Sequence, residues 1–185
     1  MAVRIRCAIY LGLLRAMPLF EATRCKVADD VSRLLQIGPV KLDDRCERQA
    51  VQDSVDRLVR YGGDEDAFDG MFPYYVQSRV VDVAAAMATD MPSPARSWRL
   101  AGSWLDEVWQ NADFVLERAE SRLADGFEMT LADMELWWQE ADARSLRGVP
   151  DVEAALESRL VILRAERRWA TRQAIAGAVA ELAGW

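Results

Sequence analysis

Paired acidic side chains are the residues of this sequence that come closest to a catalytic pattern. Asp43-Asp44-Arg45-Cys46-Glu47 places two adjacent aspartates ahead of a helical stretch. Carboxylates one helical turn apart, facing a deep apolar cavity, can hold magnesium against a diphosphate. The residue one turn after Asp43 is Cys46, so the second ligand is missing. We therefore expect Asp43 or Asp44 to cap a helix, with Glu47 reaching back to its free amides.

A second acidic segment, residues 64–70, combines aspartates with neighbouring glycines, as calcium-binding loops do. An EF-hand loop needs a glutamate at its twelfth position. Counted from Asp64, that position holds Tyr75. We expect a solvated loop here and no metal site.

The residue types that most often carry catalysis are scarce or missing. There is no histidine among the 185 residues, which removes the usual general base and the commonest metal ligand. Only Lys26 and Lys41 are lysine, so Schiff-base chemistry is disfavoured. Cys7, Cys25 and Cys46 form an odd set without a CxxC pair, as in reduced cytosolic proteins. We expect no catalytic residue, no cofactor and no bound metal, although a helical enzyme acting on diphosphates stays open as one hypothesis.

The charge of the chain is distributed unevenly. Its net charge is −7, which argues against wholesale nucleic-acid binding. Residues 94–142 hold eleven acids and four arginines, whereas residues 143–172 hold seven arginines and four acids. Such a chain can pair head to tail with copies of itself or with a polarised partner. The alternative is that these charges only solvate the surface.

The N-terminal segment, residues 1–17, allows three structures. Apolar residues at positions 3, 5, 7, 9, 11 and 13 alternate with other types, which favours a strand, yet Ile5, Ile9 and Leu13 also fit one helical face. We find no second strand, so a strand, a helix or an arm all remain possible. Arg15 interrupts the apolar run, and we expect neither a secretion signal nor a membrane span.

Helix signals divide the rest of the chain. Pro18 suits the first turn of a helix that ends at Gly38-Pro39. Thr130, followed three residues later by Asp133, predicts another helix start. A last, long helix is expected to begin at Pro150.

Two consecutive helices between residues 73 and 123 form the predicted centre of the protein. The second carries an apolar stripe with acids on the opposite face: Ala101, Leu105, Val108, Ala112, Val115, Ala119 and Leu123. The first, residues 73–91, is apolar nearly all round, and we expect copies of the chain to cover it.

These patterns together predict an all-α fold of five to six helices in an antiparallel helical bundle, with a possible N-terminal strand. We expect a helical core domain at residues 1–123 and a C-terminal helical extension, a long arm, at residues 124–185.

Tryptophans and arginines are the predicted partner-binding residues. Seven tryptophans are many for this length, and tryptophan is enriched at interface hot spots, although core filling is the alternative. An arginine band near the end of the chain could contact acids on another subunit or, as an alternative, phosphate. The candidates are Arg164, Arg167, Arg168, Arg172, Trp185, Trp98 and Trp109.

Two stretches together resemble one protein family. The first runs from Val31 through Leu34-Leu35 and Gly38-Pro39 to Leu58, and the second from Phe72-Pro73-Tyr74-Tyr75 through Ala84-Ala85-Ala86 into the helix after Ser93-Pro94. In this order they resemble the head-to-tail adaptor proteins of short-tailed phages, of the tail tubular protein A type. The similarity covers residues 28–123 and consists of residues that mark where helices begin and end. The insert that the family usually places between its two helix pairs is absent, since only the loop 64–71 stands there.

The resemblance implies a structural virion protein without catalysis. Its implied partners are copies of itself in a ring, typically a dodecamer, together with the portal protein and a tail or nozzle protein; DNA would only pass through the channel, and no membrane is involved. It would be assembled in the host cytoplasm and act in the virion neck. The alternative is a cytosolic all-α chaperone or protein-interaction module, also without catalysis.

Overall fold

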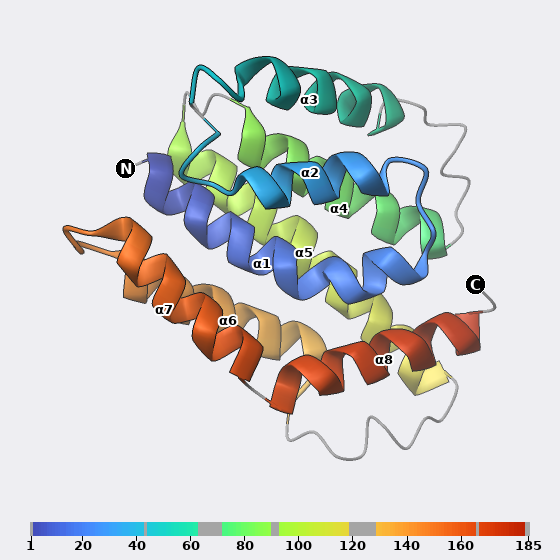
Figure 1. The fold of residues 1–185 in the computed structure, drawn as a ribbon. Helices are drawn as coiled ribbons and strands as arrows, with labels where there is room; N and C mark the ends of the chain where they lie inside the picture. Colours follow the sequence, from blue (N-terminus) through green and yellow to red (C-terminus); the bar gives the residue numbers. More distant parts are fainter. Residues whose placement is uncertain are drawn as a thin grey trace.

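The described part of the chain is helical. The computed structural model describes residues 2–42, 44–62, 72–89, 93–118, 129–165 and 167–183, and the side chains of residues 72, 94, 118, 164–165, 167–172 and 182–183 lie outside this description. Within these ranges every regular element is a helix, which confirms the all-α class, and there are eight of them rather than five or six (Figure 1). They are α1 (Ala2–Ala22), α2 (Ala28–Ile37), α3 (Arg48–Gly62), α4 (Phe72–Ala88), α5 (Pro94–Arg118), α6 (Leu131–Leu146), α7 (Val152–Ala165) and α8 (Arg167–Ala183).

The N-terminal segment is a helix and runs through the middle of the molecule. α1 has α4 and α5 behind it, α2 above it and α6, α7 and α8 below it in Figure 1. Cys7, Ile9, Leu11 and Leu13 are all buried, because neighbours pack on several sides of α1. The alternation that suggested a strand therefore reflects a helix buried on more than one face.

The prediction that Pro18 opens the second helix is wrong. Pro18 lies inside α1, which continues to Ala22. Proline has no N–H, so the carbonyl of Leu14 loses its usual intrahelical donor at this point. The burial of Leu19 and Phe20 in the core gives the last turn of α1 a packing reason to continue past Pro18.

The end of α2 was predicted correctly from the sequence, but the start of α3 was not. Gly38 ends α2 with φ of 77° and donates its N–H to the carbonyl of Leu34, as expected for a glycine cap. The start of α3 was predicted too early, because α3 begins at Arg48. The carboxylate of Asp44 instead accepts the N–H of Cys46 at 2.9 Å in the preceding turn. Asp43 lies outside the described residues.

The central pair, α4 and α5, was predicted correctly in position and pattern. The α5 stripe is buried at Ala101, Leu105, Val108 and Ala112, while residues 119 and 123 lie outside the described residues. α4 packs against α1, α3 and α5. Its apolar residues are therefore covered by its own chain, and the expectation that copies of the chain cover them is wrong for the buried positions: Val76, Val80, Val81, Val83, Ala84 and Met87.

The C-terminal helices pack onto the core, so no free arm is seen in the part of the chain that the structure describes. α6 and α8 contribute Leu131, Ala132, Ile175 and Val179 to the same apolar core as α1 and α5. The expected single last helix is two elements, α7 and α8, on either side of residue 166 (Figure 1). The predicted domain boundary at 123/124 falls in a stretch outside the described residues.

Candidate functional site

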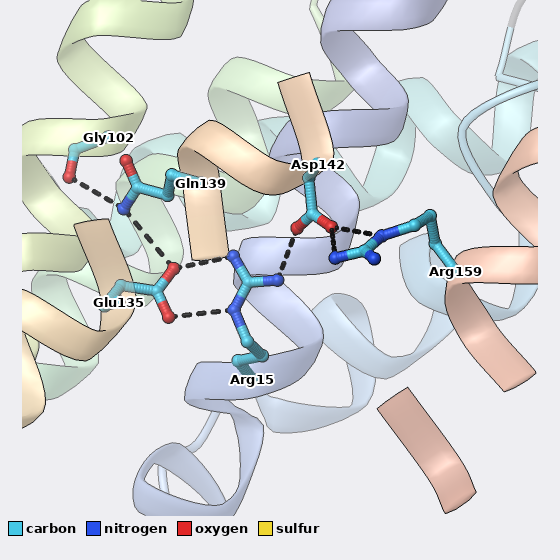
Figure 2. Close-up of polar contacts among 6 residues, drawn as sticks. All are labelled: Arg15, Gly102, Glu135, Gln139, Asp142 and Arg159. Atoms are coloured by element: carbon cyan, nitrogen blue, oxygen red, sulfur yellow. Dashed lines mark hydrogen bonds and ion pairs between the residues drawn. The ribbon is translucent and has the colours of Figure 1, made fainter. Parts of the chain in front are cut away.

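A buried cluster of charged side chains joins α1, α6 and α7 (Figure 2). The guanidinium of Arg15 binds Glu135 through two hydrogen bonds, Nε to Oε2 and Nη2 to Oε1, both at 2.8 Å. Its Nη1 donates to Asp142 Oδ2 at 2.5 Å. Arg159 of α7 donates from Nε to the other oxygen of Asp142 at 2.8 Å. The side chains of Arg15, Glu135 and Asp142 are at most 2% exposed, whereas Arg159 is 13% exposed, so the cluster is internal except on the Arg159 side.

The sequence places the polar side chains that α6 contributes to this cluster on one face of the helix. Glu135, Gln139 and Asp142 are spaced by four and three residues, which brings them to the same side of a helix. Gln139 donates to Glu135 at 3.3 Å and to the carbonyl of Gly102 on α5 at 3.4 Å. A Cβ at Gly102 would lie 2.8 Å from Gln139 Oε1, so glycine at this position leaves room for the Gln139 amide between α5 and α6.

The charges of the cluster balance. Two arginines face two carboxylates, and the Arg15 guanidinium is in contact with both acids. Burial opposes the charge of Arg15, but Glu135 and Asp142 outweigh it and raise its pKa above the ordinary value. With each carboxylate oxygen accepting from a fixed donor, the cluster is a structural tie between helices rather than a group poised to transfer protons.

Sequence reasoning missed this cluster. The sequence shows Arg15 only as an interruption of an apolar run, and Leu131, Met134, Trp138 and Ala141 as an apolar stripe on the helix that begins after Thr130. The available signal was the run of polar residues at positions 135, 139 and 142 beside that apolar stripe. Their partner, Arg15, lies 120 residues away from Glu135 in the sequence, and no periodicity connects the two.

A first surface hollow lies between the start of α1, the start of α5 and the end of α6. Its volume is about 540 Å³, within the range of small-molecule and peptide sites. Ile5, Ala8, Trp98, Ala143 and Leu146 give it an apolar lining, and its charged lining residues are Arg4, Arg99 and Arg147. We call this the basic hollow, because no carboxylate is among the described residues that line it.

A second hollow lies at the opposite end of the α5–α6 pair, with a volume of about 310 Å³. Phe114 and Leu136 at its edge are 57% and 45% exposed. We call it the acidic hollow, since its described charged lining residues are all acids: Asp106, Asp113, Glu117 and Asp133.

Two acids of this hollow have environments that disfavour ionisation. Burial raises the pKa of Asp113, although its carboxylate accepts the N–H groups of Leu131 and Ala132 at the start of α6. Burial, followed by the charge of Asp133, also raises the pKa of Asp106. A cation brought against this hollow would relieve the repulsion among these carboxylates.

The predicted partner-binding residues have different positions. Trp98 lines the basic hollow and is half-buried. Trp109 is 0% exposed and lies in the core of the chain, so it is not on the surface of a single copy. The remaining candidates lie outside the described side chains, and their role stays a prediction: Arg164, Arg167, Arg168, Arg172 and Trp185. Trp137, which was not chosen from the sequence, is 51% exposed and packs edge-on against Trp138.

The residues considered for metal binding lie largely outside the described part of the chain. The acidic loop 64–70 lies outside the described residues. Among the residues that are described, no three histidine, cysteine or acidic side chains are grouped so as to hold a metal ion. None of the helices, as far as they are described, is long and apolar enough to cross a membrane.

Comparisons with known proteins leave the chain without an assigned relative. No family model, curated protein or solved structure matches it.

Proposed function

We propose that this chain is a non-catalytic structural subunit that works by assembling with other protein chains. The observation that carries the proposal is the pair of hollows of opposite charge, one at each end of the α5–α6 pair. Charge depletion is usual at an interface core, whereas complementary charges at the rim fix the partner and its orientation. The buried Arg15 cluster supports such a role, because it ties three helices into a firm support for this surface.

In its specific form, the proposal is a ring-forming head-to-tail adaptor in the neck of a short-tailed phage. This form rests on the resemblance of residues 28–123 to that family. The partners would be further copies of the chain in a ring, a portal protein and a tail or nozzle protein. α4 is covered by its own chain, which removes one argument for a ring. The opposite charges at the two ends of the α5–α6 surface now support it instead.

Light scattering coupled to size exclusion, followed by electron microscopy, tests the proposal. We expect the purified chain to exceed the mass of a monomer and to form closed rings, alone or after addition of a phage portal protein. Recovery of the chain from purified virion necks would support the phage assignment. A monomer that binds neither itself nor a portal would remove the adaptor form.

The second candidate is an all-α chaperone or interaction module that holds a segment of one partner. The basic hollow favours it, since a hollow of about 540 Å³ with an apolar lining beside arginines suits an acidic amphipathic peptide. Capture of one specific partner that protects Trp98 from quenching, with the chain itself monomeric, would favour this candidate over the ring.

A further inference from the structure

We infer that the acidic hollow of one copy docks onto the basic hollow of a second copy. The inference rests on the proposed assembly function and names the surface that would perform it. It assigns the contact to the α5–α6 face and takes a second copy of this chain as the occupant of both hollows.

Both hollows lie along the same helix pair, and their lining residues on α5 and α6 fall on shared helix faces. Arg99, Asp106 and Asp113 follow one another at seven-residue intervals on α5, and Leu136 and Ala143 do so on α6. Residues seven apart share a helix face. Arg99 and Asp113 are fourteen positions apart, which corresponds to roughly 21 Å of helix rise. The close contact of Gly102 with Gln139 lies between the two hollows and separates them.

The two hollows are also chemically complementary. In the basic hollow Arg99 and Arg147 are exposed, and Arg4 is held by a hydrogen bond of 2.6 Å from its Nη2 to the carbonyl of Val149. Arg4 Nε is buried and has no hydrogen-bond partner among the described residues. Carboxylates from a second copy would therefore meet the exposed guanidiniums of Arg99 and Arg147 rather than this buried nitrogen.

The acidic hollow offers the matching groups. Glu117 and Asp133 are exposed acids, and Phe114 and Leu136 are apolar side chains that a single copy leaves largely in water. Docked onto Trp98 and the apolar lining of the basic hollow, these side chains would lose contact with water while the acids meet the arginines at the rim. The surface of one copy thus carries both halves of the contact.

The position of the two halves defines which assemblies are possible. A second copy turned by 180° over the same face would place each acidic hollow on a basic one and give a closed dimer. A second copy shifted along the face would use one contact on each side and give a ring or a filament. Both arrangements contain the same contact, and the mass of the assembly distinguishes them.

Charge reversal of each hollow is the test. The basic-hollow variant carries Arg99→Glu and Arg147→Glu, and the acidic-hollow variant carries Glu117→Lys and Asp133→Lys. All four residues are exposed, so the fold should survive, and circular dichroism checks this. Matched controls on α3 are Arg48→Glu with Arg60→Glu, and Asp53→Lys with Asp56→Lys, which are also exposed positions.

We expect each hollow variant to sediment as a monomer, with self-association weakened at least about tenfold, as loss of 1.4 kcal/mol would give. Both α3 controls should keep the wild-type mass. An equal mixture of the two hollow variants should regain that mass. In the mixture, the reversed hollow of one variant faces the reversed hollow of the other with opposite charge, and the two unaltered hollows also face each other with opposite charge.

The outcomes separate this contact from the ring proposal. A wild-type dimer with restoration in the mixture supports the contact and removes the ring. Rings that persist in both hollow variants overturn the contact and leave the ring standing. A wild-type monomer, or a mixture that stays monomeric, overturns the inference, as does native mass spectrometry that finds a foreign protein or a small amphiphilic anion in the basic hollow instead.

Discussion

Arg15 is the residue with the largest expected effect on stability. It is 1% exposed and its charge is balanced by Glu135 and Asp142, which are equally buried. Removing one member of a buried ion pair leaves the others uncompensated, and this commonly costs about 3–5 kcal/mol. We therefore expect Arg15→Met to lower the free energy of unfolding by that amount, as measured by urea denaturation.

Two further variants make the Arg15 prediction specific. Arg33→Met, at an exposed position on α2, should change the stability by no more than about 0.5 kcal/mol. Adding Glu135→Gln and Asp142→Asn to Arg15→Met should recover part of the loss, since no buried carboxylate is then left without Arg15, while Arg159 keeps its charge and loses Asp142 as partner. A loss below about 1 kcal/mol for Arg15→Met alone would mean that the carboxylates are compensated by another group or by water.

The thiols of Cys7 and Cys46 should differ in reactivity. Burial, followed by the charge of Glu153, raises the pKa of Cys7 to about 11, whereas Cys46 is exposed. Because the thiolate is the reactive form, iodoacetamide at mildly alkaline pH should label Cys46 rapidly and Cys7 only after unfolding. Peptide mass spectrometry measures both, and Cys46→Ser should abolish the rapid labelling.

The same pKa shift predicts a pH dependence of stability. Between the ordinary thiol pKa of 9.0 and the folded value of about 11, the folded state holds the Cys7 proton that the unfolded state releases. The free energy of unfolding should therefore fall as the pH rises through this window. Replacement by Cys7→Ala should flatten that slope, and an unchanged slope would assign the effect to other groups.

At the scale of the elements, the contact of α5 with the Gln139 amide of α6 depends on Gly102. A methyl group there would meet Gln139 Oε1 at 2.8 Å and push Gln139 away from Glu135 and from the Gly102 carbonyl. Because the Gln139 amide can rotate aside but would then lose its hydrogen bonds, we expect Gly102→Ala to destabilise the fold by about 1 kcal/mol. Thermal unfolding followed by circular dichroism measures it.

Gly177 provides the matched control for Gly102. It also lies within a helix, but a Cβ at Gly177 would meet nothing within 4 Å. Gly177→Ala should therefore stabilise α8 by about 0.5–1 kcal/mol through helix propensity. Equal effects of the two substitutions would contradict the assigned α5–α6 contact.

The helix boundaries show how far local signals reach. Gly38 ends α2 as predicted, and the Thr130 hydroxyl accepts the N–H of Asp133 at 3.0 Å as predicted. These signals succeed because a cap is satisfied by groups a few residues away. Pro18 misled because the buried residues that follow it keep α1 continuous, and such burial is a tertiary effect.

At the scale of the whole molecule, the proposed assembly should depend on salt. The exposed charges of the two hollows would face each other at the rim of the contact, where ions screen them within about 10 Å at 0.1 M salt. We expect the apparent dissociation constant of the self-associated state to rise as sodium chloride is raised from low to high concentration in sedimentation experiments. Salt-strengthened association would point instead to a contact dominated by apolar side chains such as Phe114.

The sequence by itself determined the helical class, several helix ends, the central α4–α5 pair and the uneven charge that underlies the proposed assembly. Each of these depends on residue type and on spacings of a few positions, which a local pattern records.

Only the tertiary structure decided that α1 is a central helix, that α4 is covered by its own chain and that Trp109 is internal. It also decided which acids meet Arg15, and that arginines and acids collect at opposite ends of one helix pair. The physical reason is that burial and charge pairing depend on which helix faces pack together. Glu135 is chosen as the partner of Arg15 by the packing of α6 on α1 across 120 positions, and a period of three to four residues carries no record of that choice.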